Sequence, residues 1–122
     1  VIGDVYKTDV FELARFINKD GEVIPENTIT KPPSAELRPD QKDSDSLPDY
    51  EILDEILFEY IENRKNPKEI VSMGHDQQLV KRILRMVNIN EFKRYQTAPV
   101  LRVSYKAFGT GRRMPIVAKY LS

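Results

Sequence analysis

The sequence contains no cysteine, a single histidine and no long run of apolar residues. The absence of cysteine excludes a disulfide framework and a thiolate metal site within these residues. With one histidine, a zinc site would need carboxylate ligands. Apolar runs of a few residues cannot span a bilayer, and no targeting peptide is visible. We therefore expect no membrane partner and a cytoplasmic location.

The remaining composition is that of one soluble domain or of part of a larger one. The 122 residues are 40% hydrophobic and 31% charged, which excludes a disordered or fibrous chain. The sequence opens on Val1 and not on methionine. We therefore expect that it was cut from something longer.

A net charge of zero conceals two segments of opposite charge. Residues 36–59 hold nine acidic against two basic residues, a net charge of −7. Residues 81–119 hold ten basic residues against one acidic residue, a net charge of +9. Such polarity is typical of halves that complement each other, of a second subunit or of an anionic ligand. Two solvated faces that offset each other are an equally good interpretation.

Apolar periodicity and capping residues predict a mainly helical chain. Helices are predicted over residues 8–17, 26–29, 49–62, 67–73, 76–87 and 91–94. Thr8, Asn66 and Asp76 are the expected caps of three of them, and Asn88 or Asn90 is expected to cap the last. The chain then divides into helices at 8–30, a loop at 31–48, helices at 49–95 and an extended tail at 96–122. Because helices must bury their apolar faces, we expect a missing sheet encoded upstream.

The predicted loop carries prolines at positions 32, 33, 39 and 48, which block helical and ladder hydrogen bonds. Leu37 and Leu47 are its expected hydrophobic anchors. A loop of this length is usually functional or disordered, and we interpret it as a lid or ligand-binding loop. The tail is predicted to contain a single strand at residues 100–103.

Two side chains at the ends of these elements could bind phosphate. Lys7 precedes a helix, where its ammonium group could reach phosphate oxygens. A solvated surface lysine is the commoner role. Ser34 lies on the proline-stiffened loop and could bond a phosphate or a magnesium-bound oxygen. It could equally cap a turn.

Further charged motifs have a functional and a structural interpretation each. Residues 91–94, Glu-Phe-Lys-Arg, could bind a carboxylate or phosphate, or place two cations at a helix end. Residues 109–113, Gly-Thr-Gly-Arg-Arg, could form an anion nest but lack the spacing of a phosphate loop. Asp43, Asp45 and Asp49 lack the glycine and final glutamate of a calcium loop. His75 is interpreted as a surface or cap residue, and no catalytic or metal-binding constellation can be assembled.

Three ordered motifs resemble the NAD synthetase family. Residues 32–50, from Pro-Pro-Ser-Ala-Glu-Leu to Leu-Pro-Asp-Tyr, resemble its mobile loop. Residues 4–8, Asp-Val-Tyr-Lys-Thr, and residues 90–94, Asn-Glu-Phe-Lys-Arg, resemble segments before and after it. The tail from Pro99 to Tyr120 is similar to the glutamine-dependent branch.

The resemblance implies a C–N ligase. ATP, as its Mg²⁺ complex, would adenylate the nicotinate carboxylate of deamido-NAD, and ammonia derived from glutamine would displace AMP to give NAD. By motif match, Lys7 and Ser34 would contact ATP and Lys93 would bind deamido-NAD. Phe92 stands where other members carry His or Tyr. The match assigns no catalytic residue and no metal ligand to this chain.

The family's Ser-Gly-Gly-x-Asp-Ser phosphate loop, its magnesium-binding acids and its glutaminase domain are absent from this sequence. We therefore expect the C-terminal helical part of an α/β, Rossmann-like domain of the adenine nucleotide α-hydrolase type. Alone it should be inactive and prone to associate, and the parent is expected to be a homo-oligomer.

Two alternatives belong to other functional classes. The first is a non-catalytic helical interaction or dimerisation module that keeps synthetase ancestry. The second is nucleic-acid binding through the basic segment, where Tyr95, Tyr105 and Phe108 alternate with cations. We rank this one last and expect no nucleic-acid partner.

Overall fold

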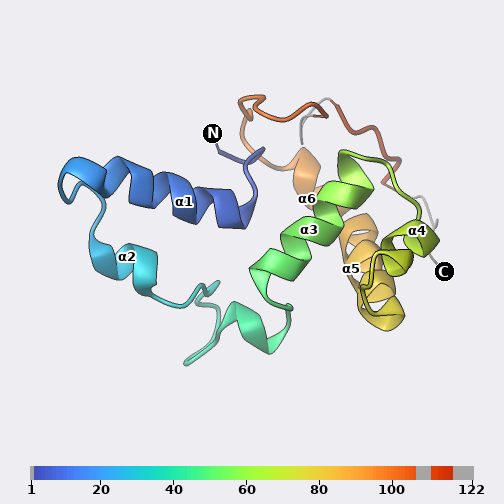
Figure 1. Cartoon of the computed structure of the whole chain (residues 1–122), viewed down its shortest axis with the longest axis horizontal. Helices are drawn as coiled ribbons and strands as arrows, with labels where there is room; N and C mark the ends of the chain where they lie inside the picture. The colour runs from blue at the N-terminus through green and yellow to red at the C-terminus, as the bar shows by residue number, and fades with distance from the viewer. Residues whose placement is uncertain (1, 107–110, 117–122) are drawn as a thin grey trace. The chain divides into compact units, whose positions relative to one another are not determined.

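The computed structural model describes residues 2–106 and 111–116. Within them lie six α-helices and two 3₁₀ turns, without a β-strand (Figure 1). These elements are α1 (Lys7–Ile17), η1 (Asn18–Asp20), α2 (Glu26–Thr30), η2 (Asp43–Asp45), α3 (Tyr50–Ile61), α4 (Pro67–Ser72), α5 (Gln77–Ile89) and α6 (Glu91–Tyr95). The prediction of a mostly helical segment is confirmed. Each observed helix begins and ends within two residues of its predicted limits.

The chain forms two compact units. Residues 6–54 make the first, with α1, α2, the long loop and the start of α3. Residues 1–5 and 55–122 make the second, with the rest of α3, α4, α5, α6 and the tail. No helix among the described residues is long and apolar enough to span a membrane.

In the first unit, a carboxylate distant in sequence holds the start of α1. Helix α1 begins one residue before Thr8, and its N-cap, Tyr6, makes no capping bond through its side chain. The prediction that Thr8 caps this helix is therefore wrong. The backbone N–H and the hydroxyl of Thr8 instead donate to Oδ2 of Asp54, at 2.8 and 3.0 Å. Asp54 is buried, so this contact satisfies a carboxylate that would be costly to bury alone.

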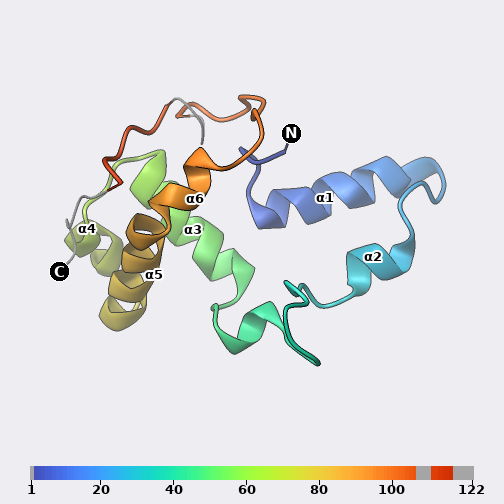
Figure 2. The same cartoon turned by 180° about the vertical axis from the view of Figure 1, so that it is seen from behind.

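Asn18 closes the turn that joins α1 to α2. Its Oδ1 accepts from the N–H groups of Val23 and Ile24, and its Nδ2 donates to the carbonyl of Ile24 at 2.7 Å. These three bonds hold α2 beside α1 (Figures 1 and 2). The predicted apolar face of α1 stays largely open, because Leu13 and Ile17 are more than 40% exposed.

The second unit holds most of the buried apolar core. Helix α5 lies against α4 and α6 (Figures 1 and 2). The side chains with almost no exposure are Ile56, Ile70, Val80, Ile83 and Leu84. Two predicted caps are confirmed here. Asn66 forms a capping box with Glu69 at the start of α4, and Asp76 accepts from the N–H of Leu79 at the start of α5.

The described residues of the tail do not form the predicted strand. Residues 100–103 have no ladder partner among the described residues. The N–H groups of Val103 and Ser104 both donate to Oδ2 of buried Asp4, at 2.7 Å each. A carboxylate therefore satisfies the amides that a neighbouring strand would otherwise bond.

Candidate functional site

The loop between α2 and α3 is closed by polar contacts. Lys31 pairs with Glu36 at 2.5 Å, and the N–H of Asp43 donates to the carbonyl of Pro33 at 2.9 Å. The lysine lowers the pKa of the Glu36 carboxyl, first by its hydrogen bond and then by its charge. Of the two predicted anchors, Leu37 is 80% exposed, so the prediction is wrong for this residue, whereas Leu47 is partly buried. Proline stiffness and polar bonds hold the loop where an apolar side chain was expected to do so.

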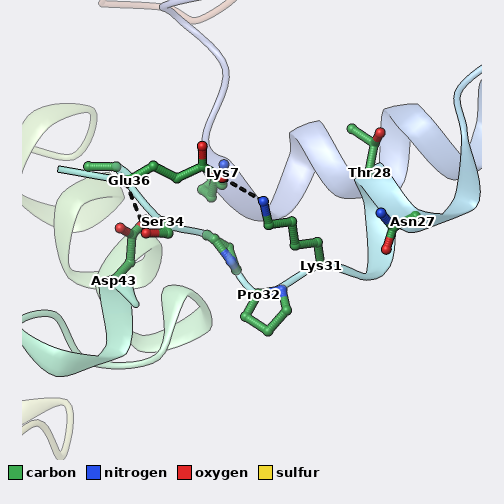
Figure 3. A pocket seen from close by; sticks show the side chains of 10 residues that line it. Lys7, Asn27, Thr28, Lys31, Pro32, Ser34, Glu36 and Asp43 are labelled. Atoms are coloured by element: carbon green, nitrogen blue, oxygen red, sulfur yellow. Dashed lines mark hydrogen bonds and ion pairs between the residues drawn. The ribbon is translucent and has the colours of Figure 1, made fainter. Parts of the chain in front are cut away.

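A pocket of about 530 Å³ lies against this loop, and we call it the loop pocket. Its walls are Lys7 at the start of α1, Asn27 and Thr28 of α2, residues 31–36 and Asp43. Lys7 and Ser34 both line it, although 26 residues separate them in the sequence (Figure 3). The structure therefore brings together the two side chains that were predicted to bind ATP.

Aromatic rings fix the place of the Lys7 ammonium group. Its Nζ lies 5.2 Å from the ring centre of Phe11 and 5.7 Å from that of Tyr50. Both distances are within the range of a cation–π contact. No ion-pair partner for Lys7 is found within the described residues, so its charge is not neutralised there by a carboxylate. An anion entering the pocket would meet the oriented ammonium group of Lys7, although the carboxylates of Glu36 and Asp43 also line the walls.

Ser34 also has a structural role in the loop. Its Oγ accepts a hydrogen bond from the N–H of Glu36 at 3.0 Å (Figure 3). Glu36 has a φ of 52°, a left-handed conformation that is uncommon for a residue other than glycine. Ser34 therefore stabilises a tight turn, as its structural interpretation predicts. A hydroxyl that accepts one bond can still donate its hydrogen, so this role leaves phosphate binding open.

Tyr50, one of the two rings that contact Lys7, also bonds the loop, a role that the sequence did not indicate. Its hydroxyl donates to Oδ2 of Asp43. Partial burial, followed by this hydrogen bond and the negative charges of Asp43 and Asp54, raises the pKa of Tyr50 to about 12. The fold therefore favours the neutral phenol and, with it, the contact that ties η2 to the start of α3.

This pKa predicts a loss of stability at high pH. The unfolded phenol ionises near pH 10, so the contribution of neutral Tyr50 is complete below that pH. This contribution to the free energy of unfolding is lost as the pH rises from about 10 to about 12. In that range the phenol ionises in the unfolded state but stays neutral in the folded state, so ionisation stabilises only the unfolded state. Urea unfolding of the wild-type chain should show this extra decline, and Tyr50→Phe should remove it. Absorbance titration should show a late tyrosine that is missing in the variant. Joint titration of all tyrosines near pH 10 would contradict the assignment.

Lys93 lies in the second unit and does not line the loop pocket. It is exposed on α6, beside the exposed ring of Phe92. The neighbouring Arg94 is different, because it pairs with buried Glu91. The sequence predicts that both cations of this motif could bind an anion. Because Arg94 is paired with Glu91, Lys93 is the candidate anion-binding residue of the motif.

The remaining sequence candidates take structural roles. Asp43 accepts from Tyr50, and Asp45 accepts from the N–H of Lys42 at 2.9 Å. His75, interpreted as a surface or cap residue, is partly buried, with a side chain that is 13% exposed and Nε2 at 3.6 Å from Oε2 of Glu55. Of the predicted anion nest, residues 109 and 110 lie outside the described residues. Arg112 in that motif bonds Glu91 and Asn88.

The loop pocket combines an oriented lysine with a hydroxyl on a stiff loop, two groups that can bind an anion. The family model described as NAD synthase matches residues 1–97. The chain therefore belongs to the NAD synthase family.

Curated relatives agree with this assignment. Glutamine-dependent NAD(+) synthetases from Acinetobacter baylyi and from Synechocystis are 55% and 49% identical over 119 residues, or 96% and 98% of this chain. The one from Thermotoga maritima is 49% identical over 122 residues. This chain spans 21 to 22% of the length of these relatives.

A solved structure is also similar. It is the glutamine-dependent NAD+ synthetase from Acinetobacter baumannii in complex with ADP. The TM-score is 0.57 at 41% identity, over 93% of this chain and 19% of that one.

Proposed function

We propose that these residues form part of a glutamine-dependent NAD+ synthetase. In the proposed reaction, ATP adenylates the nicotinate carboxylate of deamido-NAD, pyrophosphate leaves, and ammonia from glutamine displaces AMP to give NAD. Family membership and the names of the relatives support this proposal. The proposed parent domain is the α/β, Rossmann-like domain expected from the sequence, to which this chain contributes helices, loop and tail.

Within that reaction, we assign Lys7 and Ser34 to ATP and Lys93 to deamido-NAD. The observation that carries the ATP assignment is the convergence of Lys7 and Ser34 on the loop pocket. The presence of ADP in the related solved structure supports a nucleotide ligand for the family. The work of these residues is to bind and orient charged groups, which can supply much of the catalysis of such a transfer.

Magnesium would enter this scheme with the phosphates of ATP. Within residues 2–106 and 111–116, no group of three or more His, Cys, Asp or Glu side chains could hold a metal ion. A magnesium site needs several oxygen ligands in octahedral geometry, so these residues alone do not fit one. We therefore derive no step through the ion from these residues.

A segment swap tests the proposal. The matching 119 residues of the Acinetobacter baylyi relative would be replaced by this chain, giving a protein that we call the chimera. We expect the chimera to amidate deamido-NAD within about tenfold of the relative's rate, because the chain should supply the same binding groups. Product NAD would be measured with ammonia and, separately, with glutamine as nitrogen source.

The negative outcome of the swap is informative when the chimera folds. A chimera with the relative's thermal unfolding behaviour but no amidation with either nitrogen source would contradict the proposal. A non-catalytic interaction module of synthetase ancestry would then be favoured. If the complete swap does not fold, a swap limited to residues 1–97, the range of the family match, is assayed in the same way.

A further inference from the structure

A buried carboxylate joins α6 to the tail. Glu91 is only 2% exposed, and it is the one acidic residue among residues 81–119. Its Oε1 accepts from Nε of Arg94 at 2.8 Å, and its Oε2 accepts from Nη1 of Arg112 at 3.0 Å. Nη2 of the same arginine donates to Oδ1 of Asn88 at 3.1 Å. We call these four residues the Glu91 cluster.

The guanidinium group of Arg112 makes several contacts in this part of the structure. Two of its nitrogens bond side chains of α5 and α6, and its centre lies 5.5 Å from the ring centre of Tyr60. Its side chain is 13% exposed, whereas its neighbour Arg113 is exposed. Arg112 is therefore a structural cross-link and not a free anion-binding group.

Helix α6 depends on such a cross-link. It has five residues, and its N-cap, Asn90, makes no capping bond through its side chain. A helix this short has too few internal hydrogen bonds to fix its own geometry, so tertiary contacts must do so. The pair between Glu91 and Arg94 lies within α6, so the tertiary contact on this buried carboxylate is the one that Arg112 makes from the tail.

Lys93 lies on this same short helix, two residues after Glu91. The position of its exposed ammonium group therefore depends on the position of α6. We propose that Arg112 is a positioning residue for Lys93: by holding Glu91 and Asn88, the tail fixes α6 so that Lys93 meets an anionic group of deamido-NAD. This inference rests on the proposed role of Lys93.

Removing the arginine would disturb the cluster in two ways. Glu91 would keep one cationic partner where it has two, in a site that excludes water. The buried amide of Asn88 would lose its recorded partner, and its Nδ2 already has none within the described residues. Both losses favour a shift of α6, and small shifts of a binding group reduce rates strongly.

The test compares Arg112→Ala with Arg113→Ala in the chimera. Arg112→Ala should raise the KM for deamido-NAD roughly tenfold and leave the KM for ATP within about twofold. Arg113→Ala removes the same charge from an exposed position and should leave both constants within about twofold. Arg112→Lys should restore part of the loss, because lysine keeps the charge but cannot bond Glu91 and Asn88 as a planar fork.

A double substitution shows whether the effect passes through Lys93. In a Lys93→Ala background, Arg112→Ala should cause little further rise in KM, since coupled residues are not additive. Hydrogen exchange of the α6 amides should also accelerate in Arg112→Ala and not in Arg113→Ala. This readout is independent of the reaction.

The outcomes separate the two proposals. An unchanged KM for deamido-NAD in folded Arg112→Ala, or an effect that adds fully to that of Lys93→Ala, would overturn the positioning role. If Lys93→Ala itself left deamido-NAD use unchanged, the proposed function of Lys93 would fail, and the positioning role with it. Hydrogen exchange would then report only on the structural cross-link. If Arg112→Ala does not fold, Arg112→Lys carries the same comparison.

Discussion

Replacing Lys7 with alanine in the chimera is expected to raise the KM for ATP about 12- to 160-fold. That range corresponds to the loss of one hydrogen bond to a charged group, about 1.5–3 kcal/mol. Lys7 faces the loop pocket from the first turn of α1, and two aromatic rings hold its ammonium group. Steady-state kinetics at saturating deamido-NAD and ammonia would measure the change.

A purely structural lysine would behave differently. If Lys7 served only its aromatic contacts, alanine would cost about 0.5–1 kcal/mol of stability and leave the ATP profile unchanged. Lys19 provides the matched control, because its Nζ lies 4.5 Å from the ring centre of Phe16 and it does not line the pocket. Lys19→Ala should therefore change stability by a similar amount without changing the KM for ATP.

Ser34→Ala is expected to act in the same direction but more weakly. A neutral hydroxyl donor contributes about 0.5–1.5 kcal/mol, which corresponds to a rise of roughly 2- to 12-fold in the KM for ATP. The variant also loses the acceptor for the N–H of Glu36, so the loop's stability must be measured alongside. An unchanged KM for ATP would show that Ser34 stabilises the turn and does not bind ATP.

Local signals in the sequence predicted most of the helices. Asn66 before a proline, and Asp76 before an apolar stripe, are capping patterns that act within one turn, and both caps are formed. Thr8 and Asn90 stand at equally plausible positions, yet neither caps its helix through its side chain. The hydroxyl of Thr8 bonds Asp54, a partner 46 residues away that no local pattern could indicate.

The site shows the same division between local and distant interactions. Proline spacing predicted a stiff loop, and motif resemblance singled out Lys7 and Ser34, which do line one pocket. The roles of Tyr50 and Arg112 were missed. Tyr50 has the periodicity of an apolar stripe, and its hydroxyl matters only because the loop returns Asp43 to it. The local sequence around Arg112 suggested an anion nest. Its pairing with Glu91 could not be predicted, because the two residues are 21 positions apart in the sequence.

Lys93→Ala in the chimera is expected to have the largest effect on deamido-NAD use, a fall in kcat/KM of about 100-fold. A charge-assisted bond to an anionic substrate group contributes about 3 kcal/mol at the upper end of its range, which is a factor of this size. Lys93 is exposed on α6, and no described carboxylate pairs with it. The cost of its loss should therefore appear in substrate binding and not in folding.

Glutamine hydrolysis separates this role from a general defect. In the proposed enzyme, the two half-reactions use different sites, so Lys93→Ala should leave glutamine hydrolysis within about twofold of the unsubstituted chimera. Lys81→Ala is the matched control, since Lys81 is an exposed lysine on the adjoining helix α5. It should change neither half-reaction. Equal loss of both half-reactions in a folded Lys93→Ala protein would contradict the assignment. Lys93 would then act on the coupling between sites, because binding of deamido-NAD alone cannot lower both rates equally.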